Sequence, residues 1–174
     1  MDRAAEELAE RHAFDTELTV LETRCCALAR FGLDMGVEPG DDLVAGVMRA
    51  FRGRLAGTGL LAMEPEDALA WSLAGGSEHS PVDTYVGLAG AVLGAVARTA
   101  AEALGVDVEL APARLEEDSV AGCLVRTHAP SDTVVVCARL EIRAGGQPAP
   151  ARLLLVMEPK VVSALLGALA VSLH

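Results

Sequence analysis

The stretch Leu60-Leu61-Ala62-Met63-Glu64-Pro65 returns near the end of the chain as Leu154-Leu155-Val156-Met157-Glu158-Pro159. Each copy follows a strand-like segment and precedes a helix-like one. A proline suits the first turn of a helix, because its missing N–H has no partner there in any case. A chance match is less apt to put both copies at the same strand–helix junction. The repeat therefore predicts that the chain consists of two related halves.

The segments around the two copies predict the same order of elements in each half. Residues 44–51 and 134–142 are rich in β-branched side chains and predict strands. Hairpin turns are predicted at Gly53 and at Gly145-Gly146. A further strand is predicted in each half, at residues 17–20 and 108–111, and helices at residues 3–14, 66–74, 82–104 and 160–173.

This order of elements predicts the fold class. Hairpins with helices around them indicate an α/β (α+β) domain with pseudo-twofold symmetry, in which a helix–strand–strand hairpin–helix unit occurs twice around a mostly antiparallel sheet. The length of 174 residues suits one domain. We expect a single domain over residues 1–174, with halves at about 1–76 and 77–174.

The composition excludes several classes of partner. Apolar residues make up 52% of the chain, and the formal net charge is −11. Nucleic acids and anionic membrane surfaces both require dense Lys and Arg, so neither is an expected partner. The longest apolar stretch, residues 86–97, is shorter than a membrane span. Two acidic stretches, at residues 38–42 and 116–118, are interpreted as solvated loops or as a docking patch for a basic partner.

The cysteines and histidines predict no metal centre and no cofactor. Neither C-x-x-C nor H-E-x-x-H occurs in the sequence. We interpret Cys25, Cys26, Cys123 and Cys137 as small buried apolar side chains in a reducing compartment. No signal peptide is predicted, because the first residues are charged, so we expect a cytoplasmic protein.

The predicted long helix, residues 82–104, has an unusual run of small residues. Gly87, Gly90 and Gly94 lie inside it, although each interior glycine costs a helix about 1 kcal/mol relative to alanine. Close packing against a neighbouring helix would offset that cost, and so would a partner protein that docks on these glycines. Both interpretations are kept, and Gly87, Gly90 and Gly94 are the candidate partner-binding residues.

Over residues 2–169 the sequence resembles the CheC/CheX/FliY family of chemotaxis phosphatases. The resemblance is carried by the repeated unit, by G-x-L-x-G-x-x-L-L-x-x-x-P-E from Gly53 to Glu66, and by A-E-A-L-G-V-D-V-E-L-A-P from Ala101 to Pro112. It implies a cytoplasmic bacterial signalling protein that binds a CheY-like response regulator. In this family an Asn amide on a long helix holds the water that attacks the regulator's aspartyl phosphate, and a Glu three residues earlier engages the regulator's Lys.

Carried over by position, the family's motif is degenerate in this chain. Asp83 occupies its acidic position, but Gly87 stands where the Glu belongs and Gly90 where the Asn belongs. The chain contains no Asn, and its single Gln, Gln147, belongs to no such motif. The acid–amide pair is therefore missing, which favours a protein that has kept the fold without the catalysis.

Three functions are compatible with this sequence. The leading hypothesis is a non-catalytic adaptor or regulator that binds a response regulator or another chemotaxis or motility protein. The second is an aspartyl-phosphate phosphatase with a rearranged site, for which Asp83 is the candidate catalytic residue. The third is a structural domain that associates with itself, at least as a homodimer, as the middle domain of flagellar switch proteins does.

Overall fold

A computed structural model describes residues 16–35, 43–74, 80–144 and 147–172. The predicted helix at residues 3–14, the predicted turn at Gly145-Gly146 and the acidic stretch at residues 38–42 lie outside these described residues.

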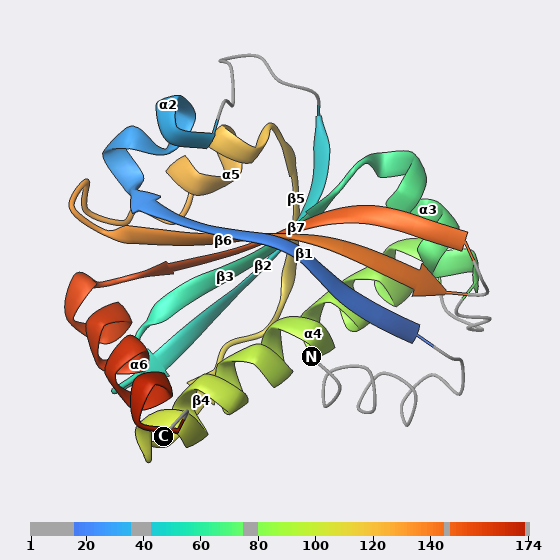
Figure 1. Cartoon of the computed structure of the whole chain (residues 1–174). Helices are drawn as coiled ribbons and strands as arrows, with labels where there is room; N and C mark the ends of the chain where they lie inside the picture. The colour runs from blue at the N-terminus through green and yellow to red at the C-terminus, as the bar shows by residue number, and fades with distance from the viewer. Residues whose placement is uncertain (1–15, 36–42, 75–79, 145–146, 173–174) are drawn as a thin grey trace.

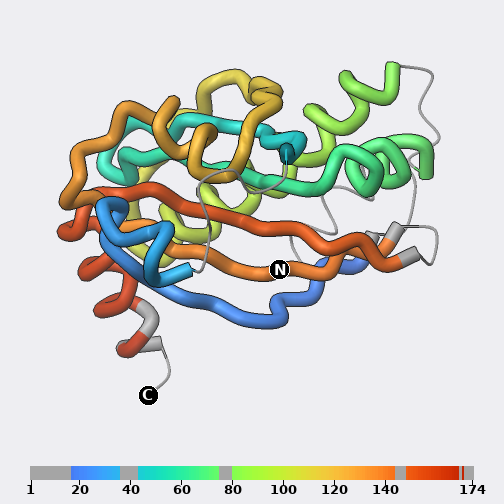
Figure 2. Tube along the Cα trace, turned by 90° about the horizontal axis from the view of Figure 1, so that it is seen from above, coloured from blue at the N-terminus to red at the C-terminus, as the bar shows by residue number. Residues whose placement is uncertain are grey.

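Seven strands form one sheet, in which every pairing is antiparallel. The order across the sheet is β1-β6-β7-β3-β2-β4, and β5 also pairs with β2. Figure 2 shows this order from the blue β1 to the cyan β2. The strands are β1 (Thr16–Ala27), β2 (Val44–Gly53), β3 (Gly57–Met63), β4 (Val108–Leu110), β5 (Arg114–Asp118), β6 (Val134–Ala144) and β7 (Gln147–Met157).

The two copies of the repeat meet at the centre of this sheet. β3 and β7 are neighbours, and Leu60 lies directly opposite Leu154, so the first residues of the two copies face each other. Helix α3 (Pro65–Ala74) then begins at the proline of the first copy, and α6 (Pro159–Ser172) at the proline of the second. The pseudo-twofold axis predicted from the repeat therefore passes between β3 and β7, and the predicted fold class is confirmed.

The outer strands follow the same symmetry with one difference. β1 pairs with β6 along its whole length, with a register shift between Val20 and Glu22. In the other half the equivalent partners of β2 are two separate strands, β4 and β5. Short helices follow in both halves: η1 (Leu28–Arg30) with α2 (Phe31–Met35), and α5 (Val120–Val125). These short helices were not predicted from the sequence.

Helices cover both faces of the sheet. The long helix α4 (Pro81–Leu104) runs across one face, and α2 and α5 lie on the other (Figure 1). Neighbouring residues of β3 therefore enter different cores: Leu61 and Met63 pack on the α4 side, while Leu60 and Ala62 pack on the α2/α5 side. A strand that is buried on both faces needs a continuous apolar run, and this explains the composition of the repeat.

Helix α4 is also long and apolar enough, by length and composition alone, to cross a membrane. The expectation from residues 86–97 counted only part of the helix. Leu88, Val92 and Leu93 are fully buried against the sheet, so core packing accounts for the hydropathy of α4.

Candidate functional site

Asp83, the candidate catalytic residue, lies in the first turn of α4, and Ser80 caps that helix. The Ser80 hydroxyl accepts a hydrogen bond from the Asp83 backbone N–H at 3.1 Å and donates one to the Asp83 carboxylate at 2.7 Å. Pro81 occupies the start of the helix between them. This reciprocal pair is a capping arrangement. The carboxylate is exposed, and its acceptance of the Ser80 hydroxyl gives it a structural role in starting α4.

Gly90 and Gly94 lie where α4 approaches the sheet most closely. Both are buried, while Gly87, one turn earlier, is half-buried. A Cβ atom on Gly90 would lie 2.9 Å from the Cβ of Ala113, and one on Gly94 would lie 2.9 Å from a guanidinium nitrogen of Arg49. The partners of these glycines are thus β2 and the segment between β4 and β5, whereas tight packing was expected against another helix.

Arg49 accounts for the glycine at position 94, where a Cβ atom would collide with its guanidinium. Its side chain rises from β2 and donates a hydrogen bond of 2.6 Å to the backbone carbonyl of Gly90. It donates a second, of 2.9 Å, to the carbonyl of Ala111. One half-buried guanidinium therefore connects β2, α4 and the β4–β5 segment. Sequence reasoning missed Arg49, because nothing in the local pattern around it distinguishes it from a surface arginine.

The structure therefore offers no acid–amide pair at the motif positions. Gly87 and Gly90 carry no side chain, and the Gly90 carbonyl is already bound by Arg49. Burial of Gly90 and Gly94 also leaves these two residues inside the folded chain. Docking of a partner in this region stays a prediction, and it would have to use more exposed residues than Gly90 and Gly94.

Exposed apolar side chains do lie next to the start of α4. Leu69 and Leu73 of α3 are 50% and 63% exposed, and Val82 of α4 is 54% exposed. We call these three residues the α3–α4 patch. Leu69 and Val82 line one small hollow of about 100 Å³. Beneath the patch, Trp71 of α3 packs edge-on against Tyr85 of α4, with ring centroids 6.0 Å apart.

The buried Tyr85 and the acidic stretch of β5 both have structural partners. The Tyr85 hydroxyl donates a 2.7 Å hydrogen bond to the Ala45 carbonyl, and burial raises the pKa of this phenol. Residues 116–118 form part of a strand, and the prediction of a solvated loop there was wrong. Two of these carboxylates, Glu116 and Asp118, form ion pairs with Arg126.

The cysteines differ in exposure. Cys26, Cys123 and Cys137 are buried as predicted, and burial raises the pKa of each thiol, that of Cys123 to about 11. Cys25 is exposed, so the prediction was wrong for this residue. Successive side chains of a strand point to opposite faces, so of the neighbours Cys25 and Cys26 only Cys26 joins the α2/α5 core. Among the described residues, no group of His, Cys, Asp and Glu is arranged to hold a metal ion.

The sequence and the structure were compared with those of known proteins. No family model matches the sequence, and no curated protein matches it either. Solved structures do match. FliY from Thermotoga maritima has a TM-score of 0.67 at 16% identity, over 95% of this chain and 87% of that one. The FliM middle domain from H. pylori has a TM-score of 0.63 at 11% identity, over 96% and 90%.

A third match is the CheX–CheY–BeF3–Mg complex from Borrelia burgdorferi, with a TM-score of 0.51 at 10% identity, over 90% of this chain and 94% of the matched one. Identities this low establish the fold alone. Each of the three structures nevertheless aligns with 90% or more of this chain. The chain therefore has the CheC/CheX/FliY-type fold that its sequence resemblance predicted.

Proposed function

We propose that this protein is a non-catalytic adaptor or regulator of a chemotaxis or motility pathway, acting in the cytoplasm by binding a CheY-like response regulator or another protein of that pathway. One observation carries the proposal. At the motif positions of a CheC/CheX/FliY-type fold, α4 presents glycines, one of which packs against Ala113 and binds Arg49 through its carbonyl.

The chemistry of aspartyl-phosphate hydrolysis supports a non-catalytic role. The regulator itself supplies the metal ion and the charge neutralisation, so the phosphatase contributes a water held in line with the phosphorus. Holding that water requires a polar side chain that projects from the helix. Asp83 is the sole motif residue with such a side chain, and Ser80 already binds its carboxylate.

The α3–α4 patch is the surface best suited to a protein partner. Leu69 and Val82 line one hollow between two packed helices, and Leu73 lies one turn after Leu69 on the same face of α3. All three expose large apolar side chains. Neighbouring apolar side chains exposed at a surface are typical of a protein-interaction site. The solved complex of CheX with CheY supports the choice of a receiver domain as the first partner to test.

The test is a titration of the full chain into fluorescently labelled CheY-type receiver domains, with and without beryllofluoride to mimic phosphorylation. We expect saturable binding that Leu73→Glu weakens about tenfold. The matched control is Leu33→Glu on α2, because Leu33 is 86% exposed but lies on the opposite face of the sheet. The absence of binding to every receiver and chemotaxis protein tested, or an equal loss with Leu33→Glu, would contradict the proposal.

A second candidate is a structural domain that associates with itself. It is favoured by the FliM middle domain, whose TM-score of 0.63 is higher than the 0.51 of CheX. Light scattering over a range of concentrations tests it. A mass that rises with concentration supports the structural role, and a monomer at the highest soluble concentration contradicts it.

A further inference from the structure

A row of charged side chains crosses the face of the sheet opposite α4. Glu22 of β1 lies directly opposite Arg139 of β6, which in turn lies directly opposite Arg152 of β7. Arg24 of β1 stands two residues further along, opposite Cys137. The short helices α2 and α5 cover only part of the strands that carry these four residues. The three arginines are exposed to solvent.

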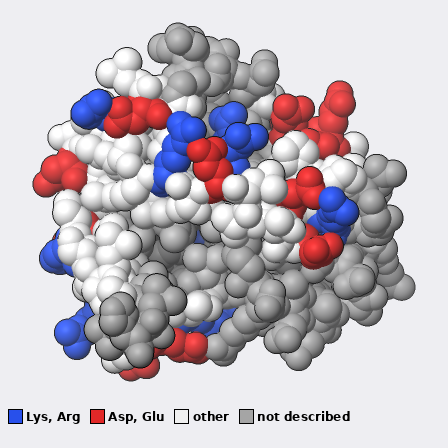
Figure 3. All heavy atoms as spheres, viewed as in Figure 1, with Lys and Arg blue, Asp and Glu red and all other residues white. Residues whose placement is uncertain are grey.

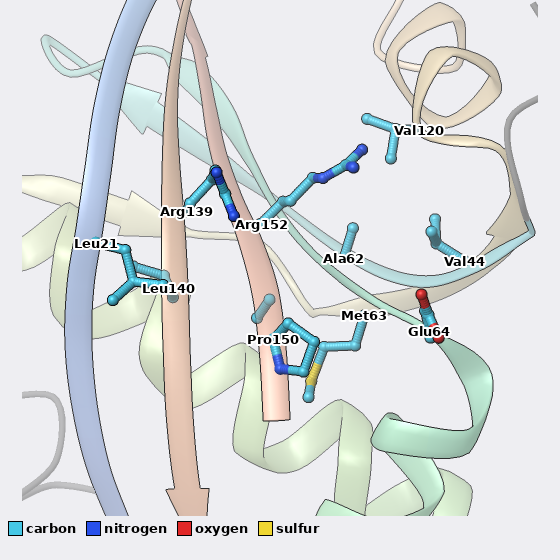
Figure 4. Close-up of a pocket in the computed structure, with 11 residues that line it drawn as sticks. Leu21, Val44, Ala62, Met63, Glu64, Val120, Arg139, Leu140, Pro150 and Arg152 are labelled. Atoms are coloured by element: carbon cyan, nitrogen blue, oxygen red, sulfur yellow. The ribbon is translucent and has the colours of Figure 1, made fainter. Parts of the chain in front are cut away.

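These side chains border two hollows that share Arg139 and Arg152. The first, shown in Figure 4, has a volume of about 310 Å³ and is lined in part by Val44, Ala62 and Val120. The second has a volume of about 240 Å³ and lies toward α2, where Phe31 and Met35 contribute to its wall. Because the same two arginines line both, the hollows form one continuous surface. We call it the basic cleft.

The charges in the basic cleft are not balanced. Glu22 binds Arg24 at 2.6 Å and Arg139 at 3.6 Å. Its hydrogen bond with Arg24 is the main cause of the lowered pKa of the Glu22 carboxyl. No ion pair to Arg152 is present within the described part of the chain. Glu64 is the other carboxylate, and it lines the first hollow. The basic cleft as a whole therefore holds three guanidinium groups and two carboxylates, in a protein whose net charge is −11.

The position of Arg152 opposite Arg139 adds a physical argument. Like charges directly opposite each other on neighbouring strands destabilise a sheet. An anion placed between the two guanidiniums would relieve that repulsion and accept hydrogen bonds from both. In Figure 3, Lys and Arg side chains (blue) lie next to Asp and Glu side chains (red) on the upper part of the visible face.

We propose that the basic cleft binds an acidic peptide segment of a partner protein, with carboxylates on Arg152 and Arg139 and apolar side chains against Phe31, Val44 and Val120. An extended peptide suits two hollows in succession better than a single small anion does. An anionic membrane is disfavoured, because the net charge of −11 repels it. The cleft lies on the other face of the sheet from the α3–α4 patch, so this inference stands independently of receiver binding.

The experiment measures fluorescence anisotropy of a labelled eight-residue peptide of alternating glutamate and leucine with the full chain. We expect saturable binding that weakens as salt rises from about 50 to 300 mM. Arg152→Gln should weaken it about tenfold, because a charge-assisted hydrogen bond is lost. Arg143→Gln is the matched control, since Arg143 lies on the same strand as Arg139 but lines neither hollow.

Three results would overturn the proposal. The first is the absence of binding by the glutamate peptide, or equal binding by a peptide with glutamine in place of glutamate. The second is an equal loss of affinity in Arg143→Gln and Arg152→Gln, which would show attraction to charge in general. The third is binding to phosphatidylserine vesicles in place of the peptide. Selective loss with Arg152→Gln alone supports the site.

Discussion

The two faces of the sheet are closed by different means. On one face the 24-residue helix α4 lies directly on the strands, and glycine allows the contact. On the other face the helices α2 and α5 have five and six residues and cover the strands incompletely. The closed face has glycine at positions 87 and 90, where the acid–amide pair was sought, whereas the open face has accessible charges.

Arg49 and Arg152 illustrate what the difference teaches. Both project from strands near the middle of the sheet, but Arg49 lies under α4 and donates to two backbone carbonyls. Arg152 is exposed beside Arg139. The same residue type therefore stabilises the fold where carbonyls surround it and is available to a ligand where the sheet is open.

The largest expected effect comes from removing the closed-face arginine. Arg49→Gln loses two charge-assisted hydrogen bonds and leaves the Ala111 carbonyl without this donor. We expect the free energy of unfolding to fall by about 3 kcal/mol. Urea denaturation followed by circular dichroism measures it. A loss no greater than that of Arg152→Gln would show that the two faces do not differ as described.

Gly90→Ala tests the contact between α4 and the β4–β5 segment. The new Cβ would meet the Cβ of Ala113 at 2.9 Å, and we expect a loss of about 2 kcal/mol from overpacking. Gly167→Ala on α6 is the matched control, because no atom lies within 4 Å of its added Cβ. That variant should instead gain up to about 1 kcal/mol from helix propensity. Equal effects of the two substitutions would contradict the close approach.

The buried thiol of Cys123 predicts a loss of stability in alkali. Its pKa is raised to about 11 by burial, whereas an exposed thiol has a pKa of about 8.5. The unfolded chain therefore releases this proton first, so the stabilisation is complete below that pH and declines up to pH 11. From pH 8 to 10 we expect Cys123→Ala to lose about 2 kcal/mol less than the unaltered chain. Parallel losses in both proteins would contradict burial of this thiol.

The smallest effect is expected on the open face. Arg152→Gln removes a like-charge neighbour of Arg139, so stability should stay the same or rise by about 0.5 kcal/mol at low salt. The same denaturation experiment measures the change, and added salt should reduce it further. A loss of more than about 1 kcal/mol would give Arg152 a structural role instead.

Much of the fold could be predicted because each copy of the repeat contains the end of a buried strand and the start of a helix. The apolar run of each copy needs burial on both sides, and the proline after it starts a helix, so strand and helix follow from local chemistry. The short helices α2 and α5 were missed because five or six residues give no periodic signal. The division into β4 and β5 was missed for a similar reason, since it depends on pairing with β2.

The candidate site was predicted less completely than the fold. The sequence predicts that the motif lacks its acid–amide pair, because Gly87 and Gly90 stand at those positions, and this assignment stays a prediction. It could not predict the partners of the glycines, because Arg49 and Ala113 are distant from them in sequence and reach them only through the sheet. The basic cleft was missed for the same reason, since its arginines are spread over three strands and meet through cross-strand register.

The most direct test of the central claim is the dephosphorylation rate of phosphorylated CheY-type receiver domains, measured with and without this protein. The fold without its acid–amide pair predicts that the rate is unchanged even at concentrations where the receiver is bound. An acceleration would contradict the account. If Asp83→Ala abolished that acceleration, the exposed carboxylate at the start of α4 would be catalytic after all.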